Sequence, residues 1–296
     1  VGSEMCIRDR FFVFYLGCEV VGIAVAAGLW GVRLAIGRTR YLALNFRVQC
    51  WWARTLFAGA ERVFGVRLEV KGLDQLGEGP ILLLQRHASI GDTVLPAVVV
   101  SSRQGIRLRY VIKRELLWDP CLDIVGNRLP NYFVRRGWGD TAQEIAAVRR
   151  LAENLGPDEG VFICPEGTRF TPDRQRRALD RIRRQGDADL VARAERLRNV
   201  LPPRLGGTLV LLEGRTGADA VFCAHFGFDG IRSFYDFLGG GLIDRIIEVE
   251  VWRVPAARIP EDREGQIDWL YHHWSRVDEW VGQRSGAAAA PPQNSG

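Results

Sequence analysis

A histidine and an aspartate in the segment His87-Ala-Ser-Ile-Gly-Asp92 are the first residues whose types and spacing indicate chemistry. A neutral imidazole can take a proton from a hydroxyl group, and a neighbouring carboxylate can fix its tautomer and stabilise the protonated ring. On one continuous helix the two side chains would point about 140° apart, so they can cooperate only across a turn. The spacing alone leaves open a second interpretation, in which Asp92 only caps a helix.

A second polar segment, Pro165-Glu166-Gly167-Thr168-Arg169, follows an apolar run that ends at Cys164. The guanidinium of Arg169 can make a charge-assisted contact to a phosphate, and Thr168 adds a hydroxyl group. Gly167 allows close approach of the backbone to a ligand. The two segments together predict chemistry on a phosphate-bearing substrate.

Both segments follow predicted buried strands, at Pro80–Gln85 and Gly160–Cys164. Ligands of open α/β sheets bind at the carboxyl ends of the strands, so we expect the two segments to meet at one sheet edge. Ser89 can cap a helix that the pattern predicts over Thr93–Val100, which places Asp92 in its first turn beside His87.

The remaining pattern alternates strands and helices, which predicts an α/β fold. Further strands are expected at Arg67–Lys71, Arg109–Ile112, Tyr132–Val134, Thr208–Leu212, Ala220–Ala224 and Ile246–Val254. We expect an amphipathic helix at Thr141–Asn154 and a helical hairpin, broken near Gly186, at Arg174–Val200. The low-complexity residues from Ser285 onward predict a disordered tail.

The segment Phe11–Ile36 is almost wholly apolar and long enough to cross a bilayer. Glu19 interrupts it, and one carboxylate in hydrocarbon costs about 3 kcal/mol, so a buried or interfacial helix is the alternative. The arginines that follow favour the cytoplasmic side for the rest of the chain. The next segment, with Trp51 and Trp52, is typical of an interfacial helix or of a core helix.

Composition excludes several other functions. The chain has 296 residues, a formal charge of +5 and six scattered cysteines. The cysteines form no C-x-x-C pair and no histidine lies at metal-ligand spacing from them, which argues against a zinc site and against a disulfide framework. Tandem His272-His273 is interpreted as part of an interfacial helix face, and His225 as a core or loop histidine. No aromatic residues interleave with the arginines of 174–200, which argues against nucleic-acid binding. The absence of a G-x-S-x-G segment argues against a serine hydrolase.

The order of these segments resembles the glycerolipid acyltransferase family, whose best-known members acylate lysophosphatidic acid. The first family block, H-x-x-x-x-D, is matched by His87 and Asp92, and the third, F-P-E-G-T-R, is matched with Cys164 in place of Phe. Weaker matches are Phe133-Val134-Arg135-Arg136 and the L-x-P-R-x-x-G block at Leu201–Gly207. The resemblance covers roughly residues 46–279.

The resemblance implies a mixed central sheet flanked by helices, as in glycerol-phosphate acyltransferase, with an N-terminal membrane helix. It implies that His87, oriented by Asp92, activates an acceptor hydroxyl for attack on the thioester of acyl-CoA or acyl carrier protein. The implied phosphate-binding residues are Arg136, Glu166, Gly167, Thr168 and Arg169, with Glu166 bracing one of the arginines. No metal and no further cofactor are expected.

The expected reaction is esterification of lysophosphatidic acid to phosphatidic acid on the cytoplasmic face of a membrane. Another acceptor, such as glycerol phosphate, a different lysophospholipid or an amino-acid lipid, and a non-catalytic lipid-binding role remain alternatives. We expect a leader at 1–10, a membrane helix at 11–36, an interfacial helix at 37–66, an acyltransferase domain at 67–283 and a disordered tail at 284–296.

Overall fold

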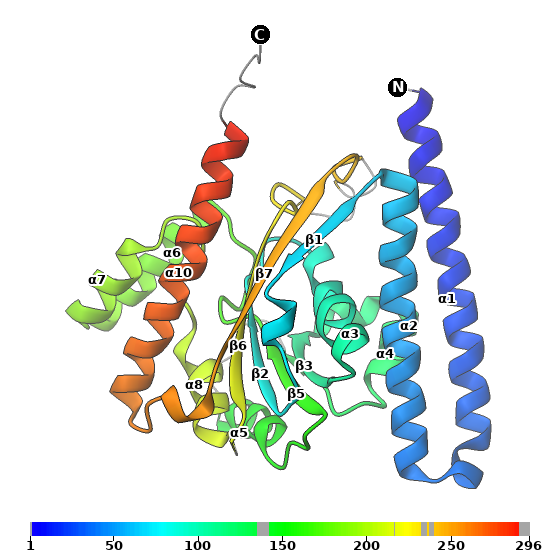
Figure 1. Ribbon diagram of the computed structural model, residues 1–296, viewed down its shortest axis with the longest axis horizontal. Helices are drawn as coiled ribbons and strands as arrows, with labels where there is room; N and C mark the ends of the chain where they lie inside the picture. Colours follow the sequence, from blue (N-terminus) through cyan, green and yellow to red (C-terminus); the bar gives the residue numbers. More distant parts are fainter. Residues whose placement is uncertain (1, 135–141, 216, 232–235, 237–239, 290–296) are drawn as a thin grey trace.

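The apolar runs of the sequence form the middle of one seven-stranded sheet that helices cover on both faces (Figure 1). This computed structural model describes residues 2–134, 142–215, 217–231, 236 and 240–289. The spatial order of the strands is β1-β7-β6-β2-β5-β3-β4. The strands are β1 (Arg67–Lys71), β2 (Ile81–Gln85), β3 (Arg107–Lys113), β4 (Tyr132–Val134), β5 (Glu159–Ile163), β6 (Asp219–Phe226) and β7 (Ile246–Val254).

The sheet is mixed, as the resemblance implied. Neighbouring strands pair in parallel except β6 and β7, which pair antiparallel. The central strand β2 is parallel to β5 on one side and to β6 on the other. The carboxyl ends of these three strands therefore lie at one edge of the sheet, where ligands of such sheets bind.

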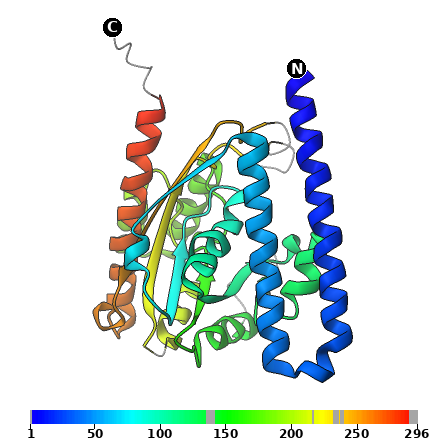
Figure 2. The ribbon, with the colours of Figure 1, turned by 45° about the vertical axis from the view of Figure 1, so that its right-hand side comes forward.

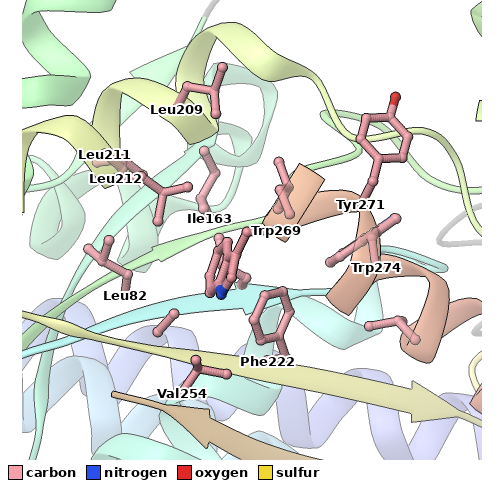
Figure 3. Close-up of a cluster of buried hydrophobic side chains, with 14 of the residues drawn as sticks. Leu82, Ile163, Leu209, Leu211, Leu212, Phe222, Val254, Trp269, Tyr271 and Trp274 are labelled. Atoms are coloured by element: carbon pink, nitrogen blue, oxygen red, sulfur yellow. The ribbon is translucent and has the colours of Figure 1, made fainter. Parts of the chain in front are cut away.

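Strand β2 is apolar throughout because both of its faces are covered. Leu82 and Leu84 belong to one hydrophobic cluster, whereas Ile81 and Leu83 belong to a second cluster on the opposite face. This alternation follows from the two-residue period of a strand, and a strand buried on both faces reads as a continuous apolar run. Figure 3 shows the first cluster, in which Trp269 of the C-terminal helix packs against Phe222 of β6, with ring centroids 5.5 Å apart.

Two groups of helices form the outer layers. The first cluster is covered by α5 (Ala142–Ala152), α6 (Pro172–Gln185), α7 (Ala188–Arg196), α8 (Leu205–Gly214) and α10 (Arg263–Ala289). The second is covered by α1 (Gly2–Ile36), α2 (Arg38–Phe64) and the π-helical turn η3 (Pro96–Ser101). Shorter elements are η1 (Leu73–Gln75), η2 (Gly91–Val94), α3 (Ser102–Gln104), η4 (Arg114–Trp118), α4 (Pro120–Gly126) and η5 (Ala256–Arg258).

Helices α1 and α2 form an antiparallel hairpin that packs along the side of the sheet domain (Figure 2). Glu19 of α1 is buried, and its carboxylate accepts hydrogen bonds from Trp52 Nε1 at 2.7 Å and from the Cys121 backbone amide at 2.9 Å. Tyr15 donates to Asp119 Oδ2 at 2.7 Å. The acidic residue that interrupts the apolar segment thus attaches α1 to α2 and α4.

Three expectations about local structure were wrong. The run Thr208–Leu212 belongs to helix α8, because a short apolar run does not distinguish a buried helix from a buried strand. The helix expected over Thr93–Val100 is divided into the 3₁₀ turn η2 and the π-helical η3, at whose start Pro96 lies. Helix α10 continues to Ala289, beyond the predicted start of the tail. Helix α1 begins at Gly2, so the described residues of the predicted leader are helical.

Candidate active site

His87 lies two residues beyond β2, in a loop that other segments hold from both sides. Its backbone amide donates to Glu166 Oε2 at 3.1 Å, and its carbonyl accepts from the Phe170 amide at 2.9 Å. The strand register pairs Leu84 with Ile163, so the two loops leave neighbouring strands side by side. The sequence prediction that the two polar segments meet at one sheet edge is confirmed.

His87 and Asp92 contact each other across the predicted turn. His87 Nδ1 lies 3.0 Å from Asp92 Oδ1, and the other carboxylate oxygen accepts from the amides of Ala88 at 2.6 Å and Ser89 at 2.7 Å. The hydroxyl of Ser89 accepts from the Gly91 amide, but the residue before η2 is Ile90 and no side chain caps this turn, so the expected N-cap role of Ser89 is wrong. Because a carboxylate only accepts hydrogen bonds, the proton of a neutral His87 lies on Nδ1 and Nε2 keeps its lone pair.

Asp92 is fully buried. Burial alone would raise the pKa of Asp92, but the charge of His87 and the hydrogen bonds from His225 and His87 outweigh it and hold the pKa well below its usual range. A carboxylate with this low a pKa keeps its negative charge at every physiological pH. It can therefore stabilise a protonated His87.

His225, which the sequence did not single out as a site residue, is the second histidine on Asp92. It is completely buried on β6, and its Nε2 lies 3.4 Å from Asp92 Oδ2 and 2.8 Å from the Arg86 carbonyl oxygen. The register of β2 with β6 pairs Gln85 with Cys223, which brings the residues just beyond them to the same level. His225 thus contacts both the backbone of the His87 loop, at Arg86, and the carboxylate of Asp92.

Glu166 was expected to brace one of the phosphate-binding arginines. Its carboxylate instead accepts a hydrogen bond from the backbone amide of His87. Besides the His87 amide, the charge that most lowers its pKa belongs to Arg86 rather than to an arginine predicted for the phosphate. Burial nevertheless dominates and raises the pKa of Glu166 well above its usual range. Arg86 is itself buried and pairs with Asp229, with Arg86 Nη2 and Asp229 Oδ1 2.5 Å apart. The described contacts make Glu166 a support for the loop.

The other residues of the second segment face a group of cations. Gly167 has φ +64°, and a Cβ atom there would lie 2.7 Å from Arg204 Cδ, so its place requires glycine. Thr168 Oγ1 accepts from Lys113 Nζ at 3.3 Å. Burial and the charge of Arg169 lower the pKa of Lys113. Arg136, predicted to bind phosphate, lies outside the described residues.

These groups surround a cavity of about 680 Å³ into which His87 opens. Its charged lining consists of six cations and two carboxylates: Lys113, Arg169, Arg174, Arg177, Arg181, Arg204, Glu115 and Glu166. A phosphate-bearing ligand fits this excess of positive charge. Cys164 also lines the cavity, but burial raises the pKa of its thiol well above the usual range, which opposes a nucleophilic role.

A second, mostly apolar cavity of about 420 Å³ adjoins the first. The two share lining residues that include Ile90, Ile112 and Leu116. Its outer wall comes from the N-terminal hairpin, with Phe11 and Phe57 among the lining residues. The cation-lined cavity beside the histidine thus adjoins an apolar one beneath α1 and α2.

The other predicted groups lie away from this site. His272 is exposed on α10, and His273 stacks on Phe222 with ring centroids 4.9 Å apart; burial lowers the pKa of His273 to about 4. In the part of the chain that the structure describes, no three His, Cys, Asp or Glu side chains gather as metal ligands.

Comparisons with known proteins agree on the family. A family profile described as Acyltransferase matches residues 67–218. The 1-acyl-sn-glycerol-3-phosphate acyltransferase of Pseudomonas aeruginosa is 31% identical over 137 residues, which are 45% of this chain and 48% of that protein, so the match spans about half of each. The crystal structure of the LPA acyltransferase PlsC from Thermotoga maritima has the same fold, with a TM-score of 0.59, 13% identity and coverage of 97% of this chain and 98% of that one. The matched segment contains both polar loops and β2 to β5, and the chain belongs to the Acyltransferase family.

Proposed function

We propose that the protein transfers a fatty acyl group from a thioester donor to the free hydroxyl of lysophosphatidic acid, which gives phosphatidic acid. The observation that carries this proposal is the position of His87. It lines a cation-rich cavity, suited to a phosphate, and this cavity shares Ile90 and Thr93 with an apolar cavity, suited to an acyl chain. The name of the Pseudomonas aeruginosa relative supports the same acceptor.

The reaction needs one base and no covalent intermediate on the protein. His87 Nε2 takes the proton of the acceptor hydroxyl while its oxygen attacks the thioester carbonyl carbon. The carbon–sulfur bond then breaks, and the proton on His87 passes to the departing thiolate, so that the products are an ester and a free thiol. Asp92 stabilises the intermediate imidazolium because its charge persists in the buried site.

The phosphate of the acceptor is assigned to the cations around Gly167. Arg169 and Lys113 line the cavity beside Thr168, and Arg204 lies against Gly167. We include Arg136 with these ligands from the sequence resemblance. Glu166 serves the same site indirectly, because it fixes the backbone of His87.

The apolar cavity supports a long-chain substrate. Each buried methylene contributes about 0.8 kcal/mol, so each added carbon should lower KM about fourfold until the cavity is full. Phe11, Phe12 and Tyr15 of α1 line this cavity. The helix that we assign to the membrane therefore also forms part of the lipid site.

We propose that α1 binds the membrane through its outward face. Its exposed apolar side chains include Phe12, Val13, Leu16, Val20, Val21, Val25, Trp30, Val32 and Leu34. Helix α1 is long and apolar enough to cross a bilayer, but its contacts with α4 and the hydrogen bond from Tyr15 to Asp119 would draw Asp119 into the hydrocarbon. An arrangement on the membrane surface avoids this, with Trp118, 89% exposed, at the lipid interface. The basic residues after α1 favour the cytoplasmic face.

The test is acyl transfer by the vesicle-bound protein. Labelled long-chain acyl-CoA and acyl carrier protein are offered in parallel with lysophosphatidic acid, glycerol phosphate and neutral lysolipids. Phosphatidic acid as the main product is expected. A different acylated product would show that lysophosphatidic acid is not the acceptor, while the acyl-transfer reaction would still stand. No product with any acceptor would contradict the enzymatic role.

A further inference from the structure

One face of helix α6 forms a wall of the polar cavity. The lining residues Arg174, Arg177, Ala178 and Arg181 recur at the spacing of a single helix face. Ala178 is buried, so this face is turned toward the domain. The helix begins directly after the second polar loop, where Thr171 Oγ1 accepts from the Arg174 amide at 3.2 Å. The position of the face is therefore tied to that loop.

The cavity holds more positive charge than one acceptor phosphate needs. A phosphate monoester carries about −1.5 to −2 at pH 7. Lys113, Arg169 and Arg204 near Gly167 are sufficient to balance it. Arg177 and Arg181 lie further along α6 and are additional to this group.

Two α6 arginines that do not line the cavity, Arg176 and Arg183, are balanced by acidic residues. Arg176 forms an ion pair with Asp173, and Arg183 NH2 lies 2.7 Å from Glu195 Oε1. No ion pair joins Arg177 or Arg181 to an acidic side chain within the described residues. The charges of Arg177 and Arg181 therefore remain available at the wall of the cavity.

We propose that Arg177 and Arg181 bind the phosphate groups of the acyl donor, and that this donor is a coenzyme A thioester. The inference rests on the proposed function and identifies its donor. Coenzyme A carries several phosphate groups on a small molecule that can enter a cavity, and guanidinium groups match phosphate oxygens in a bidentate way. An acidic protein carrier would instead bind the outer surface, where Arg176 and Arg183 are paired.

Binding of coenzyme A itself gives the first test, because it needs no catalysis. Calorimetry compares the wild type, the double variant Arg177→Gln/Arg181→Gln and the matched variant Arg176→Gln/Arg184→Gln. All four arginines are exposed residues of α6, but the matched pair does not line the cavity. The first variant should bind coenzyme A about tenfold more weakly, as expected for the loss of a charge-assisted contact. The matched variant should bind within about twofold of the wild type.

Donor kinetics give the second test. For the Arg177→Gln/Arg181→Gln variant, KM for acyl-CoA should rise about tenfold, whereas kcat and the KM for acyl-pantetheine, which lacks the phosphates, stay unchanged. Equal effects of the two double variants, or no effect of either, would overturn the assignment. A KM increase for acyl carrier protein alone would also overturn it, in favour of a protein donor.

The two proposals fail in different ways. Acyl transfer that does not depend on Arg177 and Arg181 removes the donor site and leaves the acyltransferase reaction intact. Coenzyme A binding that depends on them, without transfer to any acceptor, removes the proposed reaction and leaves the binding site.

Discussion

Replacement of Asp92 by Asn is the substitution whose effect the geometry defines most closely. The two carboxylate oxygens face only donors: His87 Nδ1 at 3.0 Å, the amides of Ala88 and Ser89 at 2.6 and 2.7 Å, and His225 Nε2 at 3.4 Å. A side-chain amide has one accepting oxygen and one NH₂ group. In either orientation, the NH₂ group meets a donor.

If the amide oxygen stays on the two backbone amides, the NH₂ group faces His87 Nδ1. That ring must then carry its proton on Nε2, where it cannot accept the proton of the acceptor. In Ser-His-Asp enzymes the corresponding change of tautomer lowers kcat on the order of 10⁴-fold, and we expect a loss of that size for Asp92→Asn. The NH₂ group also leaves a buried donor without an acceptor, which lowers the free energy of unfolding by about 3 kcal/mol.

The assay measures kcat with acyl-CoA and lysophosphatidic acid together with urea unfolding. Asp189→Asn, an exposed position on α7, is the control and should match the wild type in both measurements. A kcat for Asp92→Asn within about tenfold of the wild type would refute the tautomer argument.

The same residue predicts a pH dependence of stability. Because the pKa of Asp92 is lower in the folded state, its stabilisation is complete above the unfolded pKa of about 3.9 and is lost as the pH falls toward the folded value. The difference in unfolding free energy between wild type and Asp92→Asn should therefore be constant near neutral pH and shrink below pH 4. A constant difference down to pH 2 would contradict the assignment.

Three further substitutions test the surroundings of the site. Gly167→Ala should lower the unfolding free energy by about 1–2 kcal/mol through its left-handed backbone, and should lower kcat because the new methyl group displaces Arg204; wild-type values for both would oppose the glycine requirement. His225→Leu removes a donor from Asp92, and because the carboxylate charge is then less stabilised, the acid limb of the pH–rate profile should shift to higher pH. His225→Gln supplies a donor again and should restore the wild-type profile. Identical profiles for wild type and His225→Leu would make His225 purely structural. Glu19→Ala leaves two donors without an acceptor and should lower the unfolding free energy by about 2 kcal/mol, with faster hydrogen exchange in α1; unchanged exchange would mean that other contacts hold this helix.

The meeting of the two polar loops was predictable because local rules decide it. The runs that end at Gln85 and Ile163 are apolar on both faces, which indicates central parallel strands, and polar residues at the ends of such strands share an edge. A turn between His87 and Asp92 was predictable, although Ser89 does not cap η2 as expected.

The roles of His225 and Lys113 were not predictable because they depend on register. Each lies at the end of a strand whose neighbour in the sheet is distant in sequence, and neither is flanked by residues that indicate a site. Helix α8 was misassigned for a related reason, since only tertiary packing against α5 and α10 decides between helix and strand for its apolar run. The role of Glu19 was also not predictable, because its hydrogen-bond partners Trp52 and Cys121 are distant in sequence.

The central claim is that His87 is the base in acyl transfer, and the most direct measurement is the turnover of His87→Ala bound to vesicles. His272→Ala, a change of the same kind at an exposed position on α10, is the control. We expect that His87→Ala loses acyl transfer by a factor on the order of 10³ or more, with unchanged vesicle binding and coenzyme A affinity, and that His272→Ala keeps full activity. Wild-type turnover by a correctly folded His87→Ala protein would contradict this claim.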